Sequence, residues 1–110
     1  MTDLTRKRGD TYADQIAVVD SAGAVVDITG YSFVMTVDPS KTPSNADNNL
    51  FSLTGSIIDA VNGVVDFAPT ALQADQTPGR YWYDVQMTDA GGAIRTIVVG
   101  RYTIEQDISK

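Results

Sequence analysis

The clearest hydrophobic pattern of the chain lies near its C-terminal end, where two stretches alternate between apolar and polar residues. The first stretch has a large apolar side chain at every second position, namely Tyr81, Tyr83, Val85 and Met87. The second follows Ala90-Gly91-Gly92 and carries Ile94, Val98, Tyr102 and Ile104 at even spacing. Alternation of period two predicts strands, and a glycine-rich connection predicts a tight reversal. Residues 76–105 are therefore predicted to form a long β-hairpin.

Parity assigns the two faces of this hairpin. The loops that fit, 91–92 or 89–92, both contain an even number of residues, so an odd-numbered residue of the first strand shares a face with an even-numbered residue of the second. The predicted core face carries Tyr81, Tyr83, Val85, Met87, Ile94, Val98 and Ile104. The opposite face carries Trp82, Ile97 and Val99 beside Arg80, Asp84, Gln86, Arg95 and Arg101. This opposite face is too apolar for a plain solvent face.

Further alternating stretches precede the hairpin, at residues 12–20, 24–28, 31–38, 50–61 and 64–68. The first of them points Tyr12, Ile16 and Val18 inward, with Asp14 breaking the pattern. The stretch 31–38 is predicted to be a central strand because Tyr31, Phe33, Met35 and Val37 all face inward, while Ser32, Thr36 and Asp38 face away.

The connections between these stretches differ in character. Residues 39–49 contain two prolines and no large apolar residue, which predicts a long loop. Asp47, Asn48 and Asn49 offer oxygen atoms there, but their spacing matches no calcium-binding loop, so no metal site is predicted. Only residues 69–75 have helical character, with Leu72 placed to close the end of the core.

The dipeptide Asn62-Gly63 predicts a type I′ turn between two strands. Counting outward from it places Val61 opposite Val64, Ile58 opposite Phe67 on the inner face, and Asp59 opposite Asp66 on the outer face. Two carboxylates in that arrangement repel each other. Three explanations stay open: the pair is screened by solvent, it is paired with an arginine, or it is a cation-binding or catalytic pair.

Seven or eight short alternating strands with almost no helix predict an all-β fold, an antiparallel immunoglobulin-like β-sandwich, with a small β-barrel as the alternative. Residues 10–110 are predicted to form the single domain. Residues 1–9 form either an edge strand or an arm that docks on an acidic partner through Arg6, Lys7 and Arg8. Tyr81 is predicted to form a tyrosine corner, with its hydroxyl bonded back to the preceding chain.

Composition argues against an enzyme. The chain has no His and no Cys, so it lacks the usual catalytic base and the strongest nucleophile. The dipeptide Gly91-Gly92 joins two strands and precedes no helix, so it is no phosphate-binding loop. We expect no catalysis, no cofactor and no metal. Of the 14 acidic residues all but Glu105 are Asp, a residue typical of turns and strand ends.

Charge and hydropathy restrict the partners. A net charge of −6 argues against nucleic acid, because phosphate contacts require a basic face. No apolar run approaches the roughly 20 residues that span a bilayer, and no signal peptide precedes the fold. The sequence thus predicts a protein that is made in the cytoplasm and does not contact a membrane.

Several short motifs follow one another in a recognisable order. They are Gly9-Asp10-Thr11, Asp27-Ile28-Thr29-Gly30 before Tyr31-Ser32-Phe33, Asn62-Gly63-Val64-Val65-Asp66-Phe67, Thr77-Pro78-Gly79-Arg80-Tyr81-Trp82-Tyr83-Asp84-Val85, and Thr96-Ile97-Val98-Val99-Gly100 leading to Glu105-Gln106-Asp107-Ile108-Ser109. From residue 9 to 109, this order resembles the N-terminal domain of phage baseplate upper proteins and related small phage tail and fibre modules. The resemblance implies an immunoglobulin-like sandwich in a symmetric oligomer that attaches receptor-binding parts to a virion. Baseplate upper proteins usually continue into a long C-terminal region, whereas this chain stops at Lys110, which favours a stand-alone virion module.

The leading hypothesis is therefore a non-enzymatic phage virion protein, a part of the tail, baseplate, fibre adaptor, neck or head decoration. Its partners are itself, for example as a trimer, and other virion proteins. The candidate interface residues are Arg6, Lys7, Arg8, Arg80, Trp82, Arg95, Ile97, Val99 and Arg101. Two alternatives stay open. The face of Trp82 packs under the second sheet or under the loop 39–49 of the same chain, or the protein is a carbohydrate-binding or adhesive module that stacks sugars on Trp82 and neighbouring tyrosines.

Overall fold

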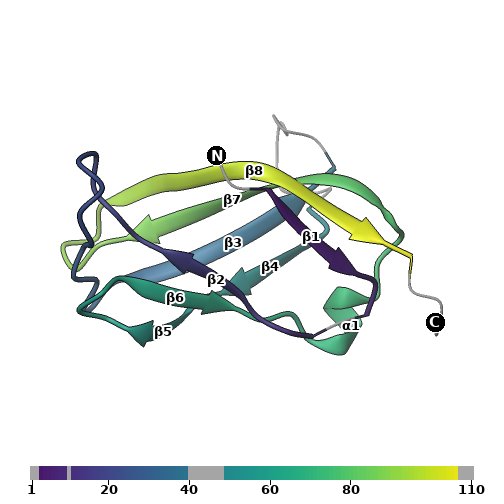
Figure 1. The fold of residues 1–110 in the computed structure, drawn as a ribbon, viewed down its shortest axis with the longest axis horizontal. Helices are drawn as coiled ribbons and strands as arrows, with labels where there is room; N and C mark the ends of the chain where they lie inside the picture. The colour runs from purple at the N-terminus through teal and green to yellow at the C-terminus, as the bar shows by residue number, and fades with distance from the viewer. Residues whose placement is uncertain (1–2, 10, 40–48, 107–110) are drawn as a thin grey trace.

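The computed structural model describes residues 3–9, 11–39 and 49–106, and these ranges contain eight strands and one short helix (Figure 1). The strands are β1 (Leu4–Lys7), β2 (Asp14–Ala17), β3 (Ser32–Asp38), β4 (Phe51–Thr54), β5 (Ser56–Asp59), β6 (Val64–Phe67), β7 (Gly79–Thr88) and β8 (Ile94–Glu105). The helix α1 spans Ala71–Ala74, and none of the described residues form a helix that is long and apolar enough to cross a membrane. Most of the predicted loop 39–49, with Asp47 and Asn48, lies outside the described residues.

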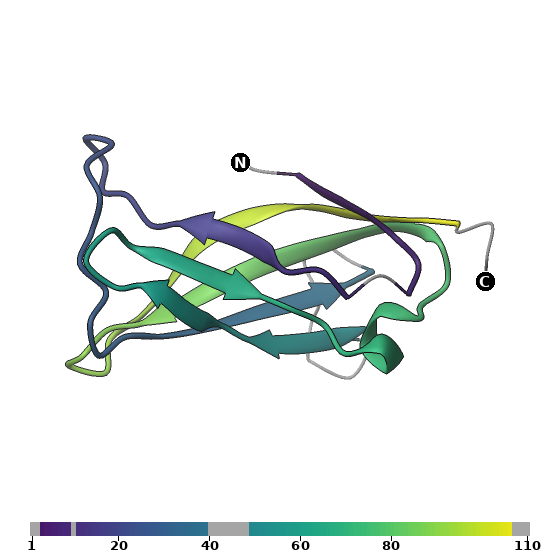
Figure 2. The ribbon, with the colours of Figure 1, turned by 60° about the horizontal axis from the view of Figure 1, so that its bottom comes forward.

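The strands form two stacked sheets. The larger sheet has the order β1-β8-β7-β3-β4 and the smaller one the order β2-β6-β5. Neighbouring strands are antiparallel apart from β1, which runs parallel to β8. Figure 2 shows the purple β2 with the teal β5 and β6 in one layer, and the green and yellow β7 and β8 in the other. The predicted all-β immunoglobulin-like sandwich is confirmed, and the alternative of a barrel is not.

The core lies between the two sheets and takes alternate residues from both. It contains Phe33, Met35, Val37, Phe51, Leu53, Tyr83, Val85, Tyr102 and Ile104 from the larger sheet, and Ile16, Val18, Ile28, Val65 and Phe67 from the other side. The ring of Tyr102 makes edge-to-face contacts with Phe51 and Tyr83, at centroid distances of 5.9 and 6.1 Å. Burial of these rings fixes which face of the larger sheet is inside, and it raises the pKa of Tyr83 to about 12.

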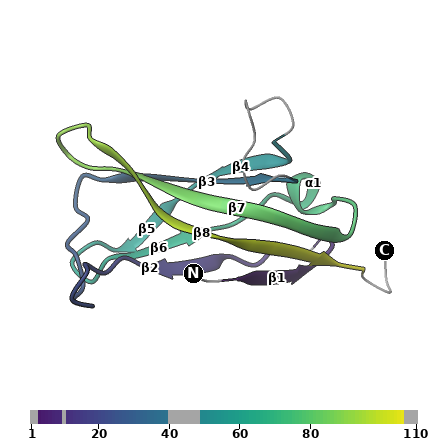
Figure 3. The same cartoon turned by 90° about the horizontal axis from the view of Figure 1, so that it is seen from above.

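Strands β7 and β8 pair along their whole length, which confirms the predicted hairpin. Figure 3 shows their connecting turn at one end of the molecule and α1 at the other. From Gly79 to Val85 the predicted parity holds, and Val85 lies opposite Val98. The register then shifts by one residue, so that Gln86 lies opposite Thr96 and Ile97 is the extra residue of a β-bulge.

This bulge corrects the predicted faces nearest to the turn. Ile94 was expected on the core face, but it pairs with Thr88 and is 68% exposed. Ile97 was expected on the outer face, but it packs partly against the core. The turn comprises residues 89–93, an odd number, and the amide of Asp89 closes it by donating to the carbonyl of Ala93 at 2.9 Å. The odd turn and the one-residue bulge cancel, so the faces predicted beyond the bulge are right.

The first half of the chain has shorter strands than predicted. Of the stretches 12–20 and 24–28, only β2 and an isolated pairing of Val19 with Val25 are strand-like. Ile16 is buried as predicted, but Tyr12 is exposed and Asp14 occupies an inward position instead. The stretch 31–38 forms β3, which lies between β7 and β4 as predicted for an interior strand.

Asp38 at the end of β3 is buried rather than facing solvent as predicted. The side-chain amide of Asn49 donates to its carboxylate at 2.7 Å. This bond gives the buried carboxylate a polar partner, which is why the position tolerates a charge.

The predicted strand 50–61 is two strands that belong to different sheets, with Gly55 between them. Strand β4 pairs with β3, whereas β5 pairs with β6. The amide of Gly55 donates to the carbonyl of Phe33 at 2.8 Å. A Cβ atom on Gly55 would lie 2.7 Å from Cγ2 of Val65 and 2.9 Å from Cβ of Phe33. The chain therefore crosses between the sheets at a point that has no room for a side chain.

The predicted turn at Asn62-Gly63 is wrong in type. A type I′ turn needs positive φ at both residues, but among the described residues only glycines have it, and here only Gly63, with φ of 70°. Strand β5 pairs Asp59 with Val64, and Ile58, expected inside opposite Phe67, is 59% exposed. The turn is therefore longer than two residues.

The longer turn also separates the two carboxylates that were expected to face each other. Asp59 accepts a hydrogen bond from the side-chain amide of Asn62 at 2.8 Å. Asp66 lies opposite Ser56 and accepts one from the side-chain amide of Gln15 at 3.0 Å. Because Asp59 and Asp66 are not a cross-strand pair, none of the three explanations of a carboxylate pair is needed.

The corner before β7 forms as predicted. The hydroxyl of Tyr81 donates to the carbonyl of Thr77 at 2.5 Å, which confirms the tyrosine corner. Just before it, Thr70 and Gln73 form a reciprocal capping box at the start of α1. Leu72 does not close the core as predicted, since it is 83% exposed. The helix α1 is a single turn, and its last residue, Ala74, is buried.

Replacement of Gly55 by alanine tests the crossing between the sheets. We expect Gly55→Ala to lower the free energy of unfolding in urea by about 1–3 kcal/mol, because the new methyl group has to displace packed side chains. Gly79→Ala is the control, since a Cβ atom there meets nothing closer than 3.8 Å. Equal stability of the two variants would contradict the described crossing.

Candidate functional site

The outer face of the larger sheet brings together four of the nine candidate interface residues. Arg80 pairs with Thr103, Trp82 with Arg101, and Asp84 with Val99 across β7 and β8. All of these alternate with the buried Tyr83, Val85 and Tyr102, so they lie on the face that the smaller sheet does not cover. We call Arg80, Trp82, Val99 and Arg101 the outer-face cluster.

The centre of this cluster is a contact between Trp82 and Arg101. The guanidinium carbon of Arg101 lies 4.5 Å from the centroid of the Trp82 ring, within the range of a cation–π interaction. Both side chains are half-buried. The alternative that Trp82 packs under the second sheet is wrong, because that sheet covers the opposite face. The alternative that this face packs under the loop 39–49 concerns residues that lie mostly outside the described part of the chain.

Three neighbours of the cluster, Val34, Thr36 and Asp84, were not among the candidate interface residues predicted from the sequence. Val34 is 41% exposed on β3, next to Gln86 and Thr54. Thr36 lies opposite Asp84, and burial among these neighbours raises the pKa of the Asp84 carboxyl. The inward positions of Phe33, Met35 and Val37 imply that Val34 points outward, so alternation along β3 was the signal that could have found it.

Arg95 and Ile97 do not belong to the outer-face cluster. The bulge places Arg95 opposite Met87, on the inner side of the sheet, and turns Ile97 toward the core. Both were expected on the outer face because the prediction assumed a regular ladder. They line the open side of the sandwich instead.

Arg6 is buried, which corrects the expectation that it forms part of an exposed arm. Strand β1 pairs with β8 as an edge strand, and Arg6 lies on its inner side with 3% of its surface exposed. Its Nη2 atom donates to the carbonyl of Tyr12 at 2.6 Å and lies 3.2 Å from Oδ2 of Asp14. The guanidinium also lies 4.4 Å from the ring centroid of Tyr12. Arg6 is therefore a structural residue that holds β1 onto the domain.

Lys7 and Arg8 remain at the surface but are engaged within the chain. Lys7 forms an ion pair with Glu105 at 3.1 Å. Arg8 forms one with Asp75 at 2.8 Å, and its backbone amide donates to the carbonyl of Glu105. Arg6 thus joins β1 to Tyr12 and to β2, Lys7 joins it to β8, and Arg8 joins it to Asp75 after α1, so none of the three belongs to the outer-face cluster.

No group of three acidic side chains among the described residues is arranged to hold a metal ion. Two carboxylates in turns bind backbone amides instead. Asp20 Oδ1 accepts the amides of Ala22 and Ala24, and Asp89 Oδ1 accepts those of Gly91 and Ala93. These are turn-stabilising bonds of the kind that Asp commonly makes.

Comparison with known proteins bears on the fold. No family model and no curated protein matches the chain. Among solved structures, CopC from Methylosinus trichosporium OB3b is similar with a TM-score of 0.54 at 9% identity, over 96% of this chain and 86% of CopC. AggA, the major subunit of aggregative adherence fimbriae type I from Escherichia coli, aligns over 96% of this chain and 91% of its own, with a TM-score of 0.35 at 14% identity. At such identity the likeness to CopC shows a shared sandwich fold and nothing about function.

The pH dependence of stability tests the buried ion pair of Arg6 and Asp14. Burial raises the pKa of Asp14 above 3.8, and Arg6 offsets only part of this effect. The folded protein therefore binds this proton more tightly than the unfolded chain, so the stability that Asp14 contributes is largest at low pH and is lost as the pH rises through the raised pKa. Asp14→Asn removes this dependence.

We expect the free energy of unfolding of the wild type to fall relative to that of Asp14→Asn between about pH 3.5 and pH 7. Parallel urea titrations across this range measure it. A difference that stays constant, or that changes in the opposite direction, would show that the attraction of Arg6 outweighs the burial of Asp14.

Proposed function

We propose that the protein is a non-enzymatic structural protein of a phage virion, which assembles with itself and with other virion proteins through the outer-face cluster. The observation that carries the proposal is the position of Trp82 and Arg101. They form a cation–π pair in the middle of a sheet face that the second sheet leaves uncovered. Tryptophan and arginine are the residues in which the binding energy of protein interfaces concentrates.

The surroundings of the pair have the composition of an interface. Val99, which is 37% exposed, lies two residues from Arg101 on β8, and Val34, which is 41% exposed, lies farther along the same face on β3, opposite Gln86. Short polar side chains complete the surface, and the hydroxyls of Thr36 and Ser52 are hydrogen-bonded to each other at 3.2 Å. An apolar centre within a polar rim is the usual anatomy of a protein–protein contact.

Assembly would proceed by burial of this face against a flat surface of another copy or of a neighbouring protein. Trp82 and Val99 would lose solvent contact at the centre, while Arg80 would form charged contacts at the rim. The order of short motifs that resembles phage baseplate and fibre modules supports a virion as the setting. Symmetric copies in such a particle would repeat the same contact.

A change of Trp82 tests this proposal. We expect wild-type protein to form an oligomer in sedimentation experiments, and Trp82→Ala to raise its dissociation constant by roughly 30-fold or more, as at interface hot spots. Val99→Asp should act in the same way by placing a carboxylate at the interface. Ile58→Asp on the far side of the sandwich is the control, and all variants should keep a β-type circular dichroism spectrum.

A wild-type protein that stays monomeric at high concentration, both alone and with the other proteins of its particle, would contradict the proposal. If such a monomer changes its Trp82 fluorescence on addition of glycans, the carbohydrate-binding alternative is favoured. Arg101 already covers one face of the indole ring, so a sugar would have to stack on the other face or displace the guanidinium.

A further inference from the structure

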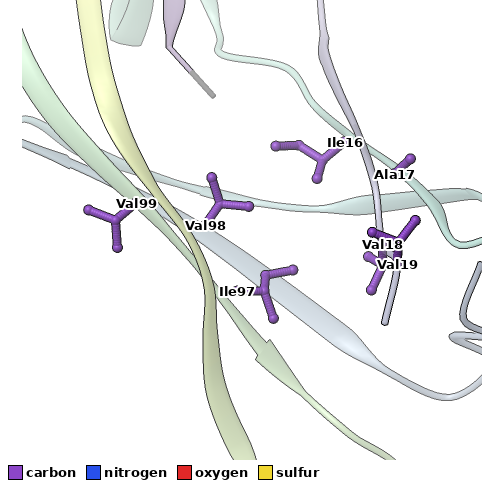
Figure 4. Close-up of a pocket in the computed structure, with 7 residues that line it drawn as sticks. All are labelled: Ile16, Ala17, Val18, Val19, Ile97, Val98 and Val99. Atoms are coloured by element: carbon purple, nitrogen blue, oxygen red, sulfur yellow. The ribbon is translucent and has the colours of Figure 1, made fainter. Parts of the chain in front are cut away.

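A groove lined by apolar side chains and by backbone runs along the open side of the sandwich, between β2 of the smaller sheet and β8 of the larger one. It has a volume of about 410 Å³, and its lining includes Ile16, Val18, Ile97 and Val98. Figure 4 shows Ile16 directed from β2 and both Ile97 and Val98 directed from β8 toward the space between the strands, whereas Val99 points away from it. The bulge at Ile97 is what turns two consecutive β8 side chains into this groove.

The β8 side of the groove is an open strand edge. Strand β1 pairs only with Tyr102 to Glu105 of β8, and the side chain of Asp3 accepts the amide of Arg101. The carbonyl of Glu105, bonded to the amide of Arg8, points to the same side. Because backbone groups alternate along a strand, the amide and carbonyl of Val99 point to this side as well, where no described strand pairs with them.

The β2 side of the groove is a second open edge. The amide of Val18 donates to the carbonyl of Gly63 at 2.8 Å, so the even-numbered residues of this segment bond toward β6. By alternation the backbone groups of Ala17 and Val19 point toward the groove. In the described structure β2 is the edge strand of its sheet, so this side of it has no neighbouring strand.

One end of the groove is acidic. A second cavity of about 320 Å³ continues it past Val18 and Ile97, and Asp20, Asp89 and Arg95 line this part. Among the described residues neither Asp20 nor Asp89 forms an ion pair, and their known hydrogen bonds use only Oδ1. Because two carboxylates and one guanidinium line this end of the groove, it favours a ligand that carries a basic group there.

We propose that this groove binds an extended segment of a partner polypeptide, which adds as a strand to the β8 edge beside Val99. Its alternate apolar side chains insert between Ile16 and Val98, and a lysine or arginine at one end meets Asp20 and Asp89. The partner supplies the backbone hydrogen bonds that β1 supplies further along the same edge. This is recognition by strand addition, in which main-chain bonds give affinity and side-chain pockets give specificity.

The surface is separate from the outer-face cluster, so the two proposals can fail independently. Strand addition uses the edge of β8 and the inner side chains Ile97 and Val98. The outer-face cluster uses the opposite side chains, Trp82 and Arg101. Trp82→Ala is therefore expected to leave strand addition unchanged.

A synthetic peptide tests the groove. The probe is the fluorescein-labelled peptide Lys-Thr-Val-Thr-Val-Thr-Val-Thr-Lys, whose binding to the full chain is measured by fluorescence anisotropy. We expect saturable binding to wild type and to Trp82→Ala, and a loss of at least tenfold in affinity with Val98→Lys, which places an ammonium in the groove. Ile58→Lys is the control, because Ile58 is 59% exposed on β5 and is not among the residues that line the groove, and it should bind as wild type does.

The same peptide with its central valine replaced by proline should not bind, since proline removes a ladder donor. If Val98→Lys fails to fold, Val99→Pro removes the amide at the open edge without touching the β7 ladder, and it should also abolish binding. The proposal is overturned if no saturable binding occurs, if Val98→Lys and Ile58→Lys bind equally, or if the proline peptide binds as well. It is also overturned if wild-type protein self-associates through this edge, so that Val98→Lys abolishes the dimer rather than peptide binding.

Discussion

The pairing of β7 with β8 is the constraint on which the rest of the structure depends. It is the longest ladder of the molecule, and its inner side supplies Tyr83, Val85 and Tyr102 to the core. Its outer side presents Trp82 and Arg101. A single bulge at Ile97 then turns the side chains of β8 near the turn toward the open side of the sandwich. One ladder thus builds the core, an exposed face and a groove.

Much of this fold follows from the period of the sequence. Alternation alone identified the hairpin, the interior strand β3 and the sandwich, because each of these buries one face of a pleated strand. The corner at Tyr81 was also predictable, since it depends on residues close in sequence. The bulge was not predictable, because the parity argument assumed a regular ladder closed by a loop with an even number of residues. The odd turn 89–93 and the extra residue Ile97 shift the register in opposite senses, so the prediction for Trp82 is right and those for Ile94 and Arg95 are wrong.

Other features depended on contacts between distant residues, which local pattern cannot show. Arg6 looks like part of a basic surface segment, and only the parallel pairing of β1 with β8 places it beside Asp14. Gly55 lies in a stretch whose apolar residues continue on both sides, so the change of sheet left no signal except the glycine itself. The candidate site was accordingly half predictable. The sequence predicted which residues of β7 and of the far part of β8 face outward, but it did not predict the side of the sheet on which Arg95 and Ile97 lie.

The central claim is that one edge of β8 is covered by β1 from Tyr102 to Glu105 and is open at Val99. Amide hydrogen exchange of the free protein tests this claim residue by residue. The account predicts slow exchange at Gly100, which bonds toward β7, and at Thr103, which bonds toward β1, with exchange at Val99 faster by orders of magnitude. Protection of Val99 equal to that of Gly100 and Thr103 would contradict the account, because some part of the chain would then already occupy the edge.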